Sequence, residues 1–391
     1  MLTQDQVKII KATAPVVGAH AQKITSTFYP LMFAAHPELK SVFNQTHQQS
    51  GGQPVALANA IVAYATHIDN LGVLSGAVQA IIQKHVSLNI QPDQYKIVGT
   101  HLMEAIAQVL GDAVTPEIAD AWGAAYWQLA DILIGGEESE YARKAAATGG
   151  WRGARRMRLQ GKEKESEVIT SFTLAPVDGG QLMDFTPGQY IGLKINLRGE
   201  TVHRNYSLSA EPNGRTYRIS VKKEPKGLVS SFLHDEAQPG FEVEIYPPAG
   251  EFTLRPGSAP VALITAGVGQ TPALPMLAAA IRSNRPVTYI HAALNSAVHA
   301  FKSHVLDIAK RTPLITPIFV YSDPLKGDKP DYTGLVTESL LQERLPRDPA
   351  TEVYFLGPTP FMKQQRSALR NLKFPDNKVA FEFFGPAEAL G

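Results

Sequence analysis

His85 is the side chain whose chemistry the sequence leaves most open. It lies in the stretch QKHVSLNIQPDQY (83–95), inside an apolar helical pattern, and Tyr95 follows ten residues later. A neutral imidazole can bind a metal through one ring nitrogen while a neighbouring group holds the other N–H. A lone histidine in such a setting is more often an ordinary buried residue. The rest of the chain must therefore decide between the two interpretations.

A glycine-containing turn follows a buried strand in LITAGVGQTPALPML (263–277). Two glycines would let a phosphate approach the backbone, and a helix opening near Thr271 would offer it free N–H groups. The spacing is not the full G-x-G-x-x-G pattern, because Pro272 holds the last position. The alternative is a turn that needs its glycines only for steric reasons. The predicted pyrophosphate site comprises Gly267, Val268, Gly269, Gln270, Thr271 and Pro272.

A second polar set ends a predicted strand in TVHRNYSLSAEPN (201–213), with Tyr190 in the preceding stretch FTPGQYIGL. The planar fork of Arg204 can bind a pyrophosphate. The ring of Tyr206 can pack on a planar cofactor, and the Ser207 hydroxyl can hydrogen-bond a ring nitrogen. The alternative is an ordinary strand with alternating side chains.

The composition limits the class of protein. The chain has 391 residues, of which 44% are hydrophobic, enough for two or three domains with their own cores. A net charge of +1 without a basic block argues against nucleic acid as a partner. Cysteine is absent, which excludes disulfides, thiolate metal sites and cysteine nucleophiles. Neither a membrane-spanning run nor a signal peptide pattern is present, so we expect a cytoplasmic protein.

The distribution of proline and glycine divides the chain. Only six of 28 prolines precede residue 150, which favours an all-α domain of five to seven helices. Short alternating runs after Gly149-Gly150 indicate an antiparallel β-barrel, and strand–turn–helix units from Pro260 onward indicate an α/β domain with a parallel sheet. The expected segments are a helical domain, a linker, a barrel and a nucleotide-binding domain, at 1–138, 139–150, 151–257 and 258–391.

Five motifs occur in an order that resembles the ferredoxin–NADP reductase superfamily: PGQY (187–190), RNYS (204–207), GLVS (227–230), AGVGQTP (266–272) and LGPTPFM (356–362). The terminal EFFGP (382–386) also matches. The resemblance implies an FAD-binding barrel followed by a domain that receives NAD(P)H at the 267–272 turn. The residues it assigns to FAD are Tyr190, Arg204, Asn205, Tyr206, Ser207, Gly227, Leu228, Val229, Ser230, Phe383, Phe384, Gly385 and Pro386.

The chain departs from that superfamily at one position. Leu356 precedes Gly357-Pro358, where members usually have a cysteine beside the nicotinamide. A thiol is not chemically required for hydride transfer, so we expect Leu356 to supply only shape. The choice between NADH and NADPH stays open. The stretch YIHAALNSA (289–297) has no acidic residue for a ribose 2′-OH and no arginine for a 2′-phosphate.

The helical domain resembles the globins, and the three-part order resembles the bacterial flavohaemoglobins over essentially the whole chain. In the stretch 26–57, Tyr29 and Gln53 match distal residues that donate hydrogen bonds to bound dioxygen, while Phe43 and Leu57 match apolar contacts of the macrocycle. His85 then resembles the proximal ligand of haem b.

The same resemblance implies a network on the proximal side of the haem. Tyr95 and Glu137 match its two members, with Glu138 as the alternative acid. Such a network makes the histidine more electron-donating, which favours chemistry on bound oxygen. Lys84 is expected at the pocket edge, as a solvated lysine.

The implied activity is nitric oxide dioxygenation, a detoxification. NAD(P)H reduces FAD, FAD passes electrons to haem, and dioxygen and nitric oxide become nitrate. We expect a monomer, with a lipid as a further candidate ligand of the haem pocket. Two alternatives remain: an oxygen-binding or sensing globin whose reductase keeps the iron ferrous, and a general flavin reductase acting on quinones, ferric compounds or peroxides.

Overall fold

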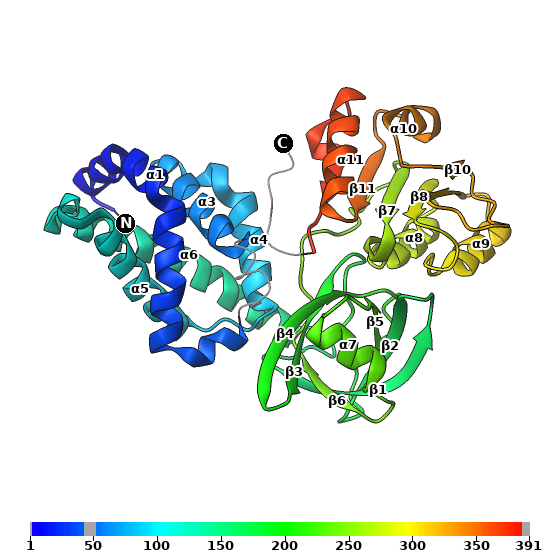
Figure 1. Ribbon diagram of the computed structural model, residues 1–391, viewed down its shortest axis with the longest axis horizontal. Coiled ribbons are helices and arrows are strands. Elements are labelled where there is room, and N and C mark those ends of the chain that lie inside the picture. Colours follow the sequence, from blue (N-terminus) through cyan, green and yellow to red (C-terminus); the bar gives the residue numbers. More distant parts are fainter. Residues whose placement is uncertain (1, 43–51, 385–391) are drawn as a thin grey trace.

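The structure is a computed structural model that describes residues 2–42 and 52–384 of the chain. Phe43, Gly385, Pro386 and the side chain of Gln53 lie outside the described residues. Figure 1 shows three lobes in chain order: a helical domain, a barrel and a mixed α/β domain. No helix in the described ranges is both long and apolar enough to cross a membrane.

The helical domain is built from long helices whose starts are set by local signals. The Thr3 side chain and Gln6 form a capping box at the first helix, and Pro92 and Pro116 occupy first helical positions, where the missing N–H costs nothing. The helices are α1 (Gln4–Ala35), α3 (Gly52–Thr66), α4 (Ser75–Val86), α5 (Pro92–Leu110) and α6 (Pro116–Ala146), with 3₁₀ turns η1 (Pro37–Ser41), η2 (Leu71–Leu74) and η3 (Gly111–Ala113).

Two features of this domain differ from a simple reading of the sequence. Pro15 and Pro30 lie inside α1, where burial of an apolar face offsets the lost backbone hydrogen bonds. Helix α6 continues to Ala146, so most of the segment 139–150 that we expected as a linker is helical. Gly136 within this helix provides room for the side chain of Ile82 on α4.

The barrel is a six-stranded antiparallel sheet in the order β4-β3-β6-β1-β2-β5. Alternate residues of β3 point into its core, as period-two patterning requires. Its strands are β1 (Arg155–Lys164), β2 (Ile169–Pro176), β3 (Tyr190–Leu197), β4 (Glu200–Ser207), β5 (Tyr217–Lys222) and β6 (Glu242–Ile245), and helix α7 (Leu228–Asp235) lies between β5 and β6 in the chain.

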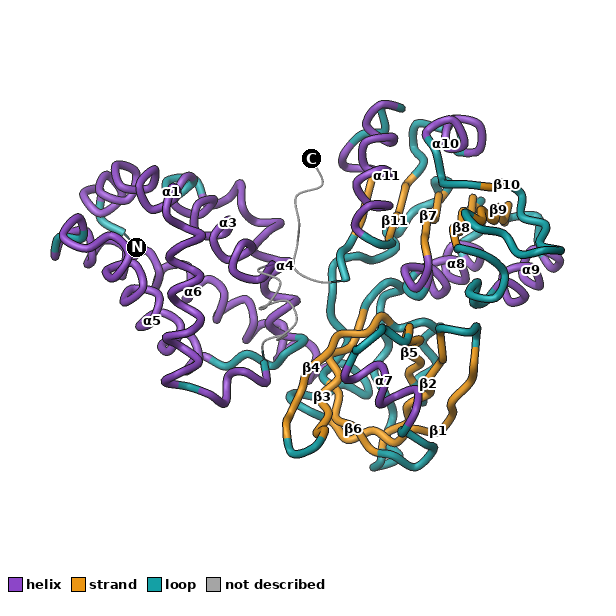
Figure 2. Tube along the Cα trace, in the orientation of Figure 1, coloured by secondary structure: helices purple, strands orange, loops and turns teal. Residues whose placement is uncertain are grey.

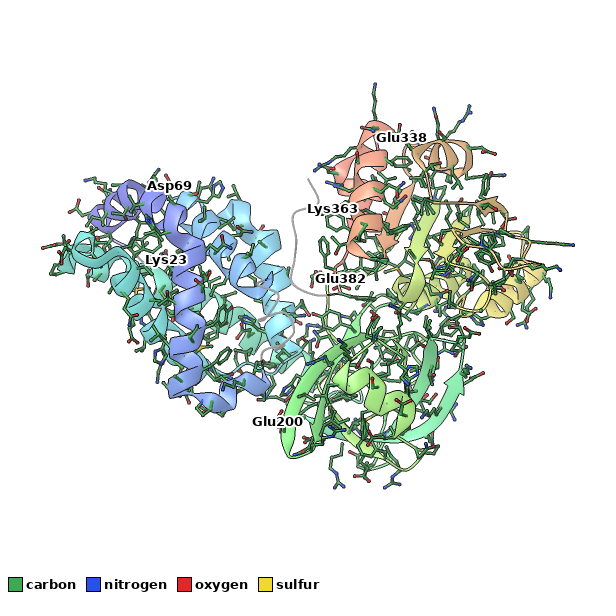
Figure 3. The ribbon with its side chains drawn as sticks, in the orientation of Figure 1. Lys23, Asp69, Glu200, Glu338, Lys363 and Glu382 are labelled. Carbon is green, nitrogen blue, oxygen red and sulfur yellow. The ribbon has the colours of Figure 1, made fainter. Side chains whose placement is uncertain are left out.

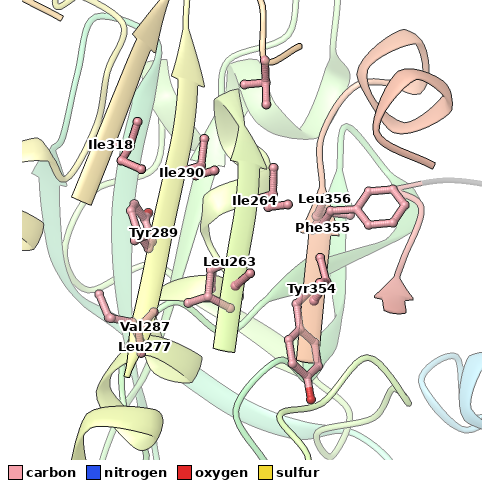
Figure 4. Packing of buried hydrophobic residues seen from close by; sticks show 14 of the residues in the cluster. Leu263, Ile264, Leu277, Val287, Tyr289, Ile290, Ile318, Tyr354, Phe355 and Leu356 are labelled. Atoms are coloured by element: carbon pink, nitrogen blue, oxygen red, sulfur yellow. The ribbon is translucent and has the colours of Figure 1, made fainter. Parts of the chain in front are cut away.

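The C-terminal domain has a parallel sheet in the order β10-β9-β8-β7-β11-β12. Strand β7 is buried along its whole length, as in sheets covered on both faces, and Figure 4 shows Ile264 and Ile290 side by side in this core. Figure 2 shows the alternation of strands and helices. The elements are β7 (Val261–Ala266), η4 (Gly267–Gln270), α8 (Ala273–Arg282), β8 (Val287–Ala293), α9 (Lys302–Arg311), β9 (Ile315–Tyr321), β10 (Tyr332–Thr333), α10 (Glu338–Arg344), β11 (Glu352–Leu356), α11 (Thr359–Asn371), η5 (Asp376–Lys378) and β12 (Val379–Phe381).

The predicted fold class is therefore confirmed: an all-α domain, an antiparallel barrel and a parallel α/β domain follow one another in the chain.

Candidate active site

Three helices bring a histidine, a tyrosine and a glutamate together. His85 lies in the last turn of α4, and its Nδ1 is 2.7 Å from Oε1 of Glu137 on α6. The Tyr95 hydroxyl, from the first turn of α5, is 2.9 Å from the same Nδ1 and donates to Glu137 Oε1 over 2.5 Å. Since the carboxylate accepts from both neighbours, His85 carries its proton on Nδ1 and presents Nε2 as a lone pair.

The structure distinguishes the two adjacent acids. Glu137 is 2% exposed and lies on His85, whereas the exposed Glu138 forms a bidentate pair with Arg152 at 2.6 and 2.7 Å. Successive residues of a helix point about 100° apart, so only one of the two can face α4. Glu137 is therefore the acid that contacts His85.

Further residues, which sequence reasoning missed, hold this network in place. The hydroxyl of Tyr126 donates to the backbone carbonyl of Tyr95 at 2.5 Å, and the missing side chain of Gly99 leaves space for the Tyr126 ring. Burial, and then the hydrogen bond to Glu137, raises the pKa of Tyr95, so this phenol stays protonated. The sequence signal was weak, because a tyrosine among apolar helix residues usually indicates packing alone.

The surroundings of His85 fit haem. Among the described residues, none hydrogen-bonds His85 Nε2, although the imidazole is 30% exposed. Apolar residues of two packed clusters flank this region, and Tyr126 and Leu129 belong to the edges of both. Apolar surroundings and one imidazole nitrogen without a partner among the described residues fit haem, whose iron His85 would hold through Nε2.

On the other side of the helical domain, Tyr29 lies on α1 and is 5% exposed. Its ring contacts Phe28 and Phe33, with centroids 4.8 and 5.9 Å away. The half-buried Leu57 on α3 packs against the same apolar cluster. Tyr29 and Leu57 are thus brought into one cluster, while Phe43 and the Gln53 side chain, also predicted to lie near the haem, are outside the described residues.

In the barrel, strand pairing brings the predicted flavin contacts together. Tyr190 pairs with Ser207, and Ile191 with Tyr206, at one end of the β3–β4 ladder. The buried Ser207 hydroxyl and the Asn205 side-chain oxygen have no hydrogen-bond partner among the described residues. Buried polar atoms rarely stay unpaired, so these two fit a bound group with polar ring atoms, as FAD has.

Arg204 and the start of α7 fit the charged part of such a cofactor. The Arg204 guanidinium donates to the His203 carbonyl at 2.8 Å and forms no ion pair with any described carboxylate. Burial lowers the pKa of Arg204, because the charged guanidinium loses contact with water. A bound pyrophosphate would offset this loss with its negative charge. Gly227 is the N-cap of α7, and the N–H groups of Leu228 to Ser230 open its first turn, where an anion is favoured.

Asn205 has a second contact that the sequence did not suggest. Its amide donates to the Ser87 hydroxyl of the helical domain at 3.1 Å. Ser87 lies two residues after His85. Asn205 therefore joins the barrel to the helix that carries the histidine.

The predicted nucleotide turn follows a buried strand directly and forms the 3₁₀ turn η4, in which the Thr271 N–H donates to the Val268 carbonyl at 3.1 Å. Strand β7 ends at Ala266, Gly267 has φ +55°, and open space surrounds the position where its Cβ would lie. A side chain at Gly269 would collide with the Leu356 carbonyl at the end of β11, which explains the second glycine. Leu356 is buried beside this turn. The open space at Gly267 would let a phosphate approach the backbone at the start of the turn.

The segment after β12 reaches the junction of the three domains, where Figure 3 labels Glu382. Burial raises the pKa of Glu382 to about 7, and the nearby Lys84 on α4 acts in the opposite direction. The Phe383 ring packs edge-on against Phe381 at 6.0 Å, while Phe384 is exposed. Lys84 on α4 is thus close enough to Glu382 for their charges to interact.

Comparisons with known proteins agree with this arrangement. Three families match the chain: Globin over residues 26–133, Oxidoreductase FAD-binding domain over 156–254 and Oxidoreductase NAD-binding domain over 263–367. Curated relatives named Flavohemoprotein, from Pseudomonas aeruginosa and Pseudomonas putida, are 50% and 49% identical, and each comparison covers 100% of both chains.

Solved structures agree as well. A flavohemoglobin from Malassezia yamatoensis, with bound FAD and heme, has a TM-score of 0.88 at 28% identity, covering 98% of this chain and 100% of its own. The FAD/NAD-binding domain of a nitric oxide dioxygenase from Vibrio cholerae has a TM-score of 0.55 at 34% identity, covering 60% of this chain and all of its own. The chain therefore belongs to the flavohaemoprotein family, in which a globin is joined to FAD-binding and NAD-binding oxidoreductase domains.

Proposed function

We propose that this flavohaemoprotein is a nitric oxide dioxygenase, which uses NAD(P)H to convert nitric oxide and dioxygen to nitrate. The observation that carries the proposal is the buried His85–Tyr95–Glu137 network. In the family's architecture, electrons pass from NAD(P)H through FAD to haem, and haem supplies the iron at which dioxygen and nitric oxide react. A carboxylate on the axial histidine favours reaction over simple storage of oxygen.

On the proximal side, the chain holds one proton in place. The Nδ1–H of His85 donates to Glu137, which carries partial negative charge onto the imidazole. The Tyr95 hydroxyl donates to the same carboxylate oxygen and limits its movement. His85 Nε2 is thereby oriented as a strongly donating ligand.

On the distal side, Tyr29 is the described residue proposed to donate a hydrogen bond to the reacting oxygen. Its phenol is buried, and the rings of Phe28 and Phe33 fix its position. With haem bound, a hydrogen bond from this phenol to a charged acceptor would be worth roughly 1.5–3 kcal/mol. Apolar Leu57 would help to exclude water from the same side.

In the reductase half, the chain positions two cofactors. Ser207 offers its unpaired hydroxyl to the flavin ring, and Arg204 and the first turn of α7 receive the pyrophosphate. The Gly267–Pro272 turn receives NAD(P)H, with Leu356 shaping the nicotinamide side. The solved relative from Vibrio cholerae, named as a nitric oxide dioxygenase, supports this reading of the reductase half.

The test uses the purified full-length holoprotein. With NADH and air, added nitric oxide should disappear in a one-to-one ratio with nitrate formed, at a rate far above that of autoxidation. Nitric oxide consumption without nitrate would contradict the proposal. Rapid NADH-dependent reduction of quinones or ferric compounds with no nitrate would favour a general flavin reductase, and tight oxygen binding with no turnover would favour an oxygen-binding globin.

A further inference from the structure

The end of α4 faces two partners at once. His85 points to α6, while Gln83 and Ser87, two residues to either side, contact the barrel. The side-chain oxygen of Gln83 accepts from the Gly250 backbone N–H at 3.2 Å, and the Ser87 hydroxyl accepts from the Asn205 amide at 3.1 Å. Gln83 is 5% exposed and Ser87 is fully buried, so both bonds are shielded from water.

Two more contacts join the same domains. The ammonium of Lys144, fully buried at the end of α6, donates to the Pro248 carbonyl at 2.5 Å. The imidazole of His203 on β4 donates to the Ser41 carbonyl at 2.8 Å. We call these four bonds, Gln83–Gly250, Ser87–Asn205, Lys144–Pro248 and Ser41–His203, the interdomain clamp.

Glycines bring the two backbones into direct contact inside the clamp. Gly192 on β3 lies opposite Asn205, and a Cβ there would overlap the Ser87 carbonyl oxygen. Gly250, at φ +113°, leaves space for the ring of Tyr190, one of the predicted flavin contacts. The helix that carries His85 is therefore packed against the strand that carries Tyr190, without an intervening side chain at Gly192.

We propose that the interdomain clamp is a positioning device for electron transfer, with Gln83, Ser87 and Gly192 as its positioning residues. It fixes the separation between α4, which holds the haem ligand, and β3–β4, which holds the flavin. Opening the clamp slows the passage of electrons from flavin to haem and leaves flavin reduction by NADH intact. This inference concerns electron delivery and is independent of the reaction at the distal side.

The decisive variant is Gly192→Ala, which forces the two backbones apart while suiting a strand conformation. Gly161→Ala is the matched control, because a Cβ on that strand glycine of the same barrel meets only Thr173 at 3.7 Å, an ordinary contact. In anaerobic stopped-flow under carbon monoxide, NADH should reduce the flavin at the parent rate in both variants. Haem reduction should be about tenfold or more slower in Gly192→Ala alone, because the rate falls steeply when two positioned redox groups are moved apart.

A second variant keeps the proposal testable if Gly192→Ala misfolds. Gln83→Leu preserves the side-chain volume and removes the acceptor of the Gly250 N–H. The Gly250 amide should therefore exchange hydrogen faster. Haem reduction should be slower, and the ferrous carbon monoxide spectrum should stay unchanged. Parent-like haem reduction in a folded clamp variant whose Gly250 amide exchanges faster would overturn the proposal. Equal slowing of flavin reduction would also overturn it, because the defect would then lie within the reductase.

Discussion

The Tyr95 hydroxyl donates a 2.5 Å hydrogen bond to Glu137, across 42 residues of sequence and between two helices. The same carboxylate oxygen lies 2.7 Å from His85. His85 Nδ1, Tyr95 and Glu137 therefore form one hydrogen-bonded network, in which removal of one side chain leaves a polar group of another without its partner.

Removal of the histidine tests the haem assignment directly. His85→Ala should yield folded protein with normal flavin absorbance and little tightly held haem. The other two members of the network, Tyr95 and Glu137, have no imidazole nitrogen to replace that of His85. The measurement is the ratio of haem to flavin in the purified variant. Normal haem content would show that the iron is bound elsewhere.

Replacement of either neighbouring acid tests the proximal network. Glu137→Gln keeps the size of the side chain and removes its charge, so His85 should become a weaker donor and the iron–histidine stretching frequency should fall. Glu138→Gln is the control, because that exposed acid pairs only with Arg152. Equal spectra for both variants would contradict a role for Glu137.

Tyr29→Phe tests the distal hydrogen bond. The ring contacts with Phe28 and Phe33 are retained, so folding, haem content and flavin reduction should survive. Loss of a bond worth roughly 1.5–3 kcal/mol should speed oxygen release about tenfold or more, with less nitrate formed. Oxygen off-rates equal to the parent's would assign Tyr29 to helix packing alone.

Leu356→Cys tests whether the reductase half would gain from a thiol at this position. Leu356 is buried at the end of β11, beside Gly269, and we expect it to supply only shape. We expect a modest change in the rate of flavin reduction by NADH and unchanged haem spectra. A very large gain in flavin reduction would mean that the leucine impairs this domain.

Lys144 gives a prediction about pH. Burial is the main cause that lowers the pKa of Lys144 to about 8, with Glu140 and Glu251 acting against it and Arg143 with it. Between pH 8 and the ordinary lysine pKa of about 10.4, the unfolded chain binds more protons than the folded one, so stability rises with pH. In this pH range, the unfolding free energy of the parent should therefore rise relative to that of Lys144→Met by up to about 1.4 kcal/mol per pH unit. If the unfolding free energies of the parent and of Lys144→Met changed equally with pH, the lowered pKa of Lys144 would be contradicted.

The sequence alone predicted the order of the three domains and the main motifs. Proline and glycine placement, strand alternation and the RNYS and GVGQTP segments are local features, and local features are readable because backbone sterics act within a few residues. The strands and turns they predicted are present, and β7 runs directly into the Gly267 turn.

Only the tertiary structure decided which groups meet. The sequence favoured Glu137 only by resemblance and left Glu138 as the alternative, and the rotation of α6 against α4 places the first on His85 and the second on Arg152. The contact of Asn205 with Ser87 joins residues 118 positions apart, and no local pattern encodes it. Such contacts depend on how whole domains pack, and packing is fixed by the shapes of buried surfaces rather than by residues adjacent in the chain.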